Sequence, residues 1–216
     1  EFRRVLFRSE VALKGRFGSL DINQLLSSAG EKSVLYGQAD GSIEVRGRAE
    51  AGEQLAQSLV GGGALAISNG KLTSMDLMKQ VELLGKFANL PTGGAGTAFR
   101  SLKTNLHFDR GRLTMDALQI VMDDLQVSGD GAMQLGAAPT VNYDLLVRLS
   151  AALTKRVLPG GNANNANDAV PVKAPGGLPG SFGSFFLDQG VLVLPLKVSG
   201  PLKQPGFGLN TALLEK

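Results

Sequence analysis

Two neighbouring stretches, LQVSGDGAMQL (Leu125–Leu135) and VNYDLLVRL (Val141–Leu149), decide the fold class of this chain. In both, an apolar residue or a glycine occupies every second position. Side chains of a β-strand point alternately to opposite faces, so this period of two gives each strand one apolar and one polar face. The pattern is typical of antiparallel strands that follow one another in a meander.

The same alternation extends upstream. LKTNLHF (Leu102–Phe108) predicts a strand, a turn follows at Asp109–Gly111, and LTMDALQIVM (Leu113–Met122) predicts the next strand. Within this second strand the apolar positions change parity. The change predicts a β-bulge or a break near Asp116 and Ala117.

Downstream, the pattern resumes after a long stretch of different composition. Residues Pro159–Gly180 are rich in Gly, Asn, Pro and Ala, which predicts a flexible surface loop. VLVLPLKVSG (Val191–Gly200) predicts another strand, and Pro195 within it lacks a backbone N–H. We therefore expect this strand to lie at a sheet edge or to carry a local break. The residues after it predict a turn and a short helix.

The N-terminal part of the chain carries shorter signals. Residues 10–58 predict the end of an upstream β-groove repeat with a short helix. Its elements are a strand end with a helical turn, a short strand in GSIEVRGRAE (Gly41–Glu50) and the helix in AGEQLAQSLV (Ala51–Val60). This helix is expected to stop at Gly61–Gly63, because glycine is common just after a helix end.

A second domain, residues 59–216, is expected to begin with a hairpin and a helix. Alternation around Asn69-Gly70 predicts a tight hairpin turn, and Ser74 then caps a helix, MDLMKQVELLGKF (Met75–Phe87). Together these elements predict a mostly β protein with a few short helices, of the α+β class. The expected architecture is an antiparallel β-meander that forms a curved sheet, groove or half-barrel, with helices covering one end.

The first residues, EFRRVLFRS (Glu1–Ser9), match in one choice of codons the end of a common sequencing adapter. We expect them to be a non-native segment. They hold three arginines and one glutamate, so without them the 22 basic and 19 acidic residues become 19 and 18. The formal net charge then falls from +3 to +1. A nucleic-acid partner, which would require a strongly basic surface, is not expected.

No arrangement of side chains in the sequence predicts catalysis, a cofactor or a metal site. His107 is the single histidine, cysteine is absent, and the adjacent acids Asp123 and Asp124 are expected at a turn between strands. The glycine runs at 61–63 and 93–96 lack the Lys-Ser/Thr that completes a phosphate-binding loop. We therefore expect a non-enzymatic protein. No apolar run is long enough to span a bilayer.

Three segments of the chain, Leu59–Val81, Thr97–Gly136 and Pro195–Leu209, resemble the AsmA family. LVGGGALAISNGKLTSMDLMKQV is similar to the family's Gly-rich start, strand, Asn-Gly, strand and aspartate-leucine helix. TAFRSLKTNLHFDRGRLTMDALQIVMDDLQVSGDGAMQLG is similar in its Thr-x-Phe start, its Gly turn, its leucine strand and its strand with paired glycines. PLKVSGPLKQPGFGL is similar to the family's Pro-leading strand and Pro-x-Phe ending.

The resemblance implies an envelope protein of Gram-negative bacteria, anchored in the inner membrane by an N-terminal helix and projecting into the periplasm. The family is linked to outer-membrane biogenesis. Its larger relatives, including TamB-type bridge-like lipid transport proteins, look like β-grooves that carry phospholipid between the membranes. The anchor is not in this sequence, and we expect it to belong upstream of the adapter-like segment.

The alternating strands predict where a phospholipid or another acyl lipid would lie. Lys103, Gln126, Gln134, Asp144 and Arg148 should occupy a polar face of the sheet. An open apolar groove on the other face suits acyl chains, which need apolar contact without specific polar partners. Two alternatives stay open: the apolar face is the core of a sandwich or half-barrel, or the protein is a scaffold that assists outer-membrane assembly components. The residues expected on one continuous, lipid-facing groove surface are Leu102, Leu106, Phe108, Ile120, Leu125, Val127, Met133, Tyr143, Leu145 and Val147.

Overall fold

The computed structural model describes residues 9–24, 35–49, 54–73, 96–157, 186–202 and 204–214. They form ten strands and the short helices α2, α4 and η1, the last of which is a 3-10 helix. The bounds are β1 Ser9–Asp21, β2 Leu35–Ala49, α2 Gln54–Ser58, β3 Val60–Leu72, β4 Thr97–Asp109, β5 Arg112–Val121, β6 Leu125–Gln134, β7 Thr140–Leu149, α4 Ala151–Val157, β8 Leu187–Asp188, β9 Val191–Pro201, β10 Gly206–Leu209 and η1 Thr211–Leu214.

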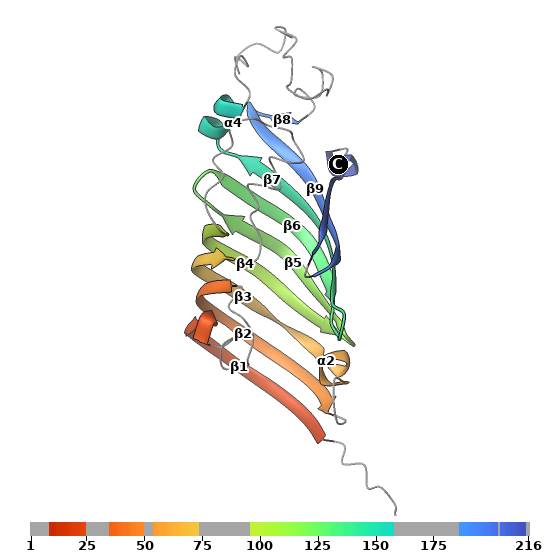
Figure 1. Cartoon of the computed structure of the whole chain (residues 1–216). Coiled ribbons are helices and arrows are strands. Elements are labelled where there is room, and N and C mark those ends of the chain that lie inside the picture. The colour runs from red at the N-terminus through yellow and green to blue at the C-terminus, as the bar shows by residue number, and fades with distance from the viewer. Residues whose placement is uncertain are drawn as a thin grey trace, which may run out of the picture.

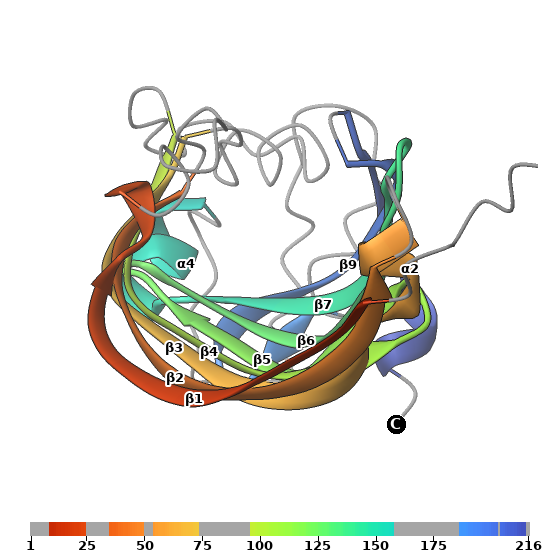
Figure 2. The same ribbon diagram turned by 90° about the horizontal axis from the view of Figure 1, so that it is seen from below.

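The strands form one antiparallel sheet (Figure 1). Their order is β1-β2-β3-β4-β5-β6-β7-β9-β10, and the short β8 pairs with β9 beside this path. Neighbours in sequence are thus neighbours in the sheet, which confirms the predicted meander. Figure 2 shows the sheet bent into an open trough. The predicted class, a mostly β chain with a curved sheet and a few short helices, is also confirmed.

The predicted parity change in β5 is a β-bulge. The pairing of β5 with β6 shifts between Met115 and Leu118, and Ala117 adopts a left-handed conformation with a φ of 51°. The backbone N–H of Ala117 donates to Asp130 Oδ1 at 2.7 Å, and Thr104 Oγ1 donates to the backbone carbonyl of Asp116 at 3.1 Å. Side chains of the two adjacent strands thus satisfy the polar groups that the bulge frees from the ladder.

The glycines Gly61–Gly63, predicted to end a helix, lie inside a strand instead. Helix α2 ends at Ser58, and β3 begins at Val60 and runs through all of them. A Cβ atom built on Gly61 or Gly63 would collide with a backbone carbonyl oxygen of β2. The glycines are therefore needed for close approach of two strands, a role that sequence alone does not separate from helix termination.

The hairpin predicted at Asn69-Gly70 is also wrong. Asn69 has a left-handed φ of 50°, as a turn would require, but β3 continues beyond it to Leu72. On either side of Asn69 the ladder to β4 is kept, because Ser68 opposes Ser101 and Gly70 opposes Phe99. Pairing with the long strand β4 therefore keeps β3 continuous at Asn69, although the left-handed conformation of this residue would otherwise favour a turn.

Pro195 lies at a gap between two partners of β9. One edge of β9 pairs with β7 along most of its length, and the other pairs with β8 at Leu192 and with β10 from Leu196 onward. The carbonyl of Pro195 points to this second edge, where it accepts a hydrogen bond from Asn210 N–H at 2.9 Å. The missing N–H thus faces the gap, which agrees with the predicted local break.

Several predicted segments lie outside the described residues. These are the helix Met75–Phe87, the loop Pro159–Gly180 and residues 1–8 of the adapter-like segment. Ser9, the last residue of that segment, begins β1 and pairs with Ala49. The predicted domain boundary after residue 58 falls between α2 and β3, and β2 and β3 pair directly across it. In the described part of the chain no helix is long and apolar enough to cross a membrane.

Candidate functional site

The register of the sheet places all the predicted groove residues on one face. Directly opposed residues of antiparallel strands point to the same side, so a row of such pairs defines a face. One row runs from β1 to β9 through Leu20, Ala39, Ile67, Leu102, Ile120, Val127, Val147 and Leu194. The remaining predicted residues, Leu106, Phe108, Leu125, Met133, Tyr143 and Leu145, lie in neighbouring rows of the same face.

We call this side the apolar face, and it extends well beyond the predicted residues. None of the residues assigned to it here is charged, and Thr104 and Tyr143 are the two among them with a polar side chain. The further members that the register assigns are Val11, Leu13, Gly15, Phe17, Gly41, Ile43, Val45, Gly47, Gly61, Gly63, Leu65, Thr104, Leu113, Met115, Leu118, Gly129, Gly131, Val141, Leu149, Leu196, Val198, Gly200, Phe207 and Leu209.

Sequence reasoning missed the two ends of this face. On β1, the apolar residues Val11 and Leu13 are separated by Ala12 and flanked by Glu10 and Lys14, a run too short to predict a site. On β9, the alternation of Leu194, Leu196 and Val198 is present in the sequence and is hidden by apolar residues at the odd positions. A count of period-two matches over each whole strand would have found both.

The opposite side of the sheet is polar. All of the residues predicted there, Lys103, Gln126, Gln134, Asp144 and Arg148, do lie on it. Ion pairs join neighbouring strands across this polar face, such as Lys14 to Glu44 at 2.8 Å and Lys197 to Asp144 at 2.9 Å. The hydrogen bond and the charge of Lys14 lower the pKa of Glu44. Such exposed ion pairs add little to the stability of the fold. The main effect of the charged side chains is therefore to hydrate this face of the sheet.

Helix α4 fixes which face is the inner one. Figure 2 shows α4 inside the curve of the sheet, next to its wall. Leu153 of α4 is fully buried and belongs to the same core cluster as Leu125 and Leu149 of the apolar face. The apolar face is therefore the inner surface of the trough, and we call the space over it the apolar groove.

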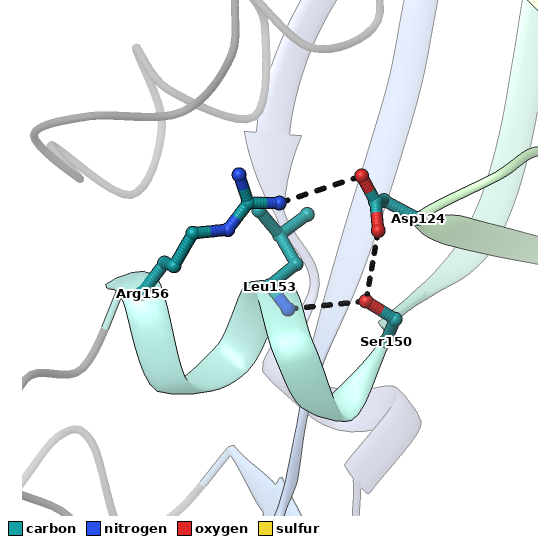
Figure 3. A network of polar contacts seen from close by, with 4 residues as sticks. All are labelled: Asp124, Ser150, Leu153 and Arg156. Atoms are coloured by element: carbon teal, nitrogen blue, oxygen red, sulfur yellow. Dashed lines mark hydrogen bonds and ion pairs between the residues drawn. The ribbon is translucent and has the colours of Figure 1, made fainter.

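A polar network holds α4 in this position (Figure 3). Ser150 is the N-cap: its Oγ accepts a hydrogen bond from Leu153 N–H at 3.1 Å and donates one to Asp124 Oδ1 at 3.1 Å. Arg156 reaches the other oxygen of Asp124 at 3.5 Å. Thr154 Oγ1 also accepts the backbone N–H of Leu192 in β9 at 3.1 Å. The helix thus ties the β5–β6 turn, β7 and β9 together at one end of the groove.

Helix α2 packs on the same face near the ends of the first strands. A Cβ atom on Gly47 of β2 would lie 3.3 Å from Leu55 Cδ1 and 3.0 Å from Leu59 Cδ2. Ser58 Oγ accepts the backbone N–H of Arg48 at 2.7 Å, which fastens the helix to β2. Both α-helices therefore cover parts of the apolar face and leave the polar face to solvent.

Burial of the apolar face changes strongly along the groove. At the C-terminal end, Val147 and Leu149 each expose 2 % of their surface. At the N-terminal end, on β1, Val11 exposes 39 % and Leu13 exposes 53 %. Isolated exposed apolar residues are common on proteins, but an exposed row that continues into a buried core is typical of a binding surface.

His107 and the adjacent acids Asp123 and Asp124 do not contribute to this face. His107 is exposed on the polar face of β4, opposite Gly62 and Thr114. Asp123 and Asp124 have separate partners, because Asp123 pairs with Arg100 at 2.7 Å whereas Asp124 belongs to the α4 network. In the part of the chain that the structure describes, no group of His, Cys, Asp and Glu could hold a metal ion.

Two hollows lie on the polar face of the sheet. One, of about 420 Å³, lies over β2 to β5, where the small side chains of Ala64 and Ala66 leave space. The other, of about 270 Å³, lies over β5 to β9 beside Leu146 and Arg148. Polar side chains such as Gln119 line both hollows, but they belong to the outer face of the sheet, and Arg148 is already paired with Asp188. The apolar groove is therefore the better candidate.

A single antiparallel sheet, bent into an open trough with an apolar inner surface and a polar outer one, defines the molecule as a β-groove protein. More particularly, the chain belongs to the AsmA family, whose family model matches residues 9–118. The match covers β1 to β4 and ends at Leu118 in β5. The family model does not cover the part of Thr97–Gly136 that follows Leu118, and it does not cover Pro195–Leu209. No curated protein and no solved structure matches the chain. Membership of this family indicates an envelope-related function.

Proposed function

We propose that this chain is a non-enzymatic envelope-biogenesis module that binds phospholipid, or another acyl lipid, along the apolar groove. In this role it would conduct lipid between the inner and outer membranes. The observation that carries the proposal is the uninterrupted apolar face, which runs from β1 to β9 without a charged residue and is open to solvent at Leu13.

The shape of the groove supports an acyl ligand. A sheet with one apolar face must cover that face with other elements or keep it for a ligand. The described helices α2 and α4 cover parts of it, and Val11, Leu13 and Leu20 remain exposed. Acyl chains would lie along such a surface because they gain apolar contact and need no specific hydrogen bonds.

The cellular setting is part of the same proposal and rests on the family. We place the module on the periplasmic side of the inner membrane, held there by an N-terminal anchor. Lipid is the proposed ligand, and no cofactor, metal or nucleic acid is required for this function. The polar face, with its exposed ion pairs, suits an aqueous compartment.

A second function is favoured by a different observation. Val127, Val147 and Leu149 each expose 3 % or less, as residues of an ordinary closed core do. A closed core of this kind is expected if the protein is a scaffold that assists outer-membrane protein assembly through a protein partner. The two functions differ in whether any lipid enters the groove.

Native mass spectrometry of the purified chain tests the proposal. Lipid binding predicts complexes heavier than the chain by the mass of one or more phospholipids, which extraction and tandem mass spectrometry would identify. The matched control is the Leu13→Lys variant, in which a charge at the open end should remove most of the lipid. A chain that carries no lipid from cell membranes, and takes up none from added vesicles, would favour the scaffold.

A further inference from the structure

Two of the residues assigned above to the apolar face, Thr104 and Tyr143, have polar side chains, and the hydroxyl of Thr104 already has partners. Thr104 is buried, and its Oγ1 lies 3.1 Å from the carbonyl oxygen of Asp116 and 3.2 Å from that of Asn105. The hydroxyl therefore serves the bulge in β5. Tyr143 is different, because its hydroxyl donates to the thioether sulfur of Met115 at 3.2 Å.

The ring of Tyr143 lies flat on the floor of the groove. Gly131 of β6 is directly opposite Tyr143, and a Cβ atom on that glycine would collide with the ring. Met115 of β5 is opposite Gly131 in turn. The side chain thus crosses from β7 over β6 to β5, and its hydroxyl lies among apolar residues.

This hydroxyl is a hydrogen-bond donor with a weak partner. A thioether is a poor acceptor compared with a carbonyl oxygen. Burial raises the pKa of Tyr143 above its usual value, so the hydroxyl keeps its proton. Tyr143 is only half-buried, and a ligand in the groove can therefore reach it. A better acceptor supplied by such a ligand would replace the sulfur.

The surroundings restrict the acceptor to a neutral group. The apolar face carries no cation, so a phosphate or a carboxylate placed at this depth would be desolvated without a counter-charge. An ester carbonyl is neutral, accepts one hydrogen bond readily and is attached directly to an acyl chain. It is the acceptor of an acyl lipid that fits this position.

We propose that Tyr143 is a specificity-determining residue whose hydroxyl donates a hydrogen bond to an ester carbonyl of the bound lipid. This inference rests on the proposed function and adds to it a lipid class, because ester-linked lipids would be preferred to ether-linked ones. Tyr143 would also fix how far along the groove the glycerol backbone of the lipid lies, over β5 to β7.

Competition between matched lipids tests the inference. A fluorescent diacyl phosphatidylcholine is bound to the full chain and displaced by phosphatidylcholines with the same chains, joined by either ester or ether bonds. One hydrogen bond within a groove predicts that the diester competes about fivefold better than the diether. In the Tyr143→Phe variant the two competitors should become equal, mainly through weaker binding of the diester.

Two further variants serve as controls. Tyr36→Phe removes the hydroxyl of the other tyrosine, which is exposed on β2, and should keep the wild-type preference for the diester. Met115→Leu removes the sulfur that now accepts the Tyr143 hydrogen bond, and should keep or increase the preference. Thermal melting of each variant reports whether the fold is intact.

The outcomes are distinct. Equal displacement by diester and diether lipids in the wild-type chain overturns the inference, whether or not Tyr143→Phe folds. A preference that survives in a folded Tyr143→Phe variant overturns it too. Failure of the wild-type chain to bind the fluorescent lipid at all overturns the proposed function itself, and the role of Tyr143 with it.

Discussion

The two ends of the groove have the same sequence pattern and opposite surroundings. At the N-terminal end, Val11 and Leu13 of β1 alternate with polar residues and are exposed to solvent. At the C-terminal end, Val147 and Leu149 of β7 alternate in the same way and are almost fully buried. The difference teaches that alternation fixes which face of a strand is apolar, whereas the elements packed on that face decide whether it is core or binding surface.

The covering elements at the C-terminal end can be named. Helix α4 places Leu153 against β7 and β9, and Phe186, next to β8, joins the same cluster. Strand β10 adds Phe207 to its margin. At the N-terminal end β1 has one pairing partner among the described strands, β2, and no described helix covers Leu13. We therefore expect substitutions of the buried residues near α4 to affect stability and those at the exposed N-terminal end to affect ligand binding.

The largest expected effect is that of Val127→Lys at the closed end. Val127 is 3 % exposed, and a lysine there would bury an ammonium group without a partner. We expect a loss of about 3–5 kcal/mol in the free energy of unfolding, enough to leave much of the protein unfolded. Urea denaturation followed by circular dichroism measures this. A variant as stable as the wild type would mean that the groove is open at Val127 as well.

The next effect in size is that of Leu153→Ala. Leu153 is fully buried between α4 and the sheet, so its truncation leaves a cavity and costs about 2–5 kcal/mol. Lys155→Ala, on the exposed side of the same helix, is the control and should change stability little. If the two alanine variants unfold at the same urea concentration, α4 does not cover the groove in solution.

A smaller loss is expected for Ser150→Ala, which removes the N-cap of α4. The Leu153 N–H and Asp124 would both lose a partner, for a cost of about 1 kcal/mol. Ser150→Asn, which keeps a capping oxygen, should recover part of the loss. Chemical denaturation separates the two variants, and identical midpoints for them would argue against the capping role.

The smallest effect on stability is expected for Leu13→Lys at the open end. Leu13 is 53 % exposed, so its replacement should change the free energy of unfolding by less than about 0.5 kcal/mol. Lipid binding should nevertheless fall, because an acyl chain cannot pass the charge without desolvating it. Ala64→Lys, exposed on the polar face, is the matched control. A fluorescent lipid titration that shows equal affinity for both variants would contradict this.

Much of the sheet could be predicted from the sequence, because alternation is a local property. Strands β4 to β7, and the bulge at Ala117, follow from positions of Leu, Val and Met along single strands. The parity of the strand pairing then follows, since a slip of one residue would move the apolar side chains to the other face. The placement of Tyr143 and Val127 on a common face needed nothing beyond this rule.

The incorrect predictions came from glycine and asparagine residues, which are compatible with more than one local structure. Gly61 is compatible with a helix end and with close strand approach, and Asn69 is compatible with a hairpin and with a kink inside a strand. Which of these local structures forms depends on the partner strand, which lies far away in the sequence. The burial of Val147 and the exposure of Leu13 were unpredictable for the same reason, since no periodicity tells what covers a face.

The most direct test of the account is site-specific photocrosslinking at two neighbouring positions of β1. Leu13 lies on the apolar face and Ala12, next to it, lies exposed on the polar face opposite Arg46. A benzophenone amino acid is placed at one or the other position, and the chain is irradiated with vesicles of radiolabelled diacyl phospholipid. If the apolar groove binds lipid, position 13 acquires the label and position 12 does not. Equal labelling at both positions, or labelling at neither, would contradict the account.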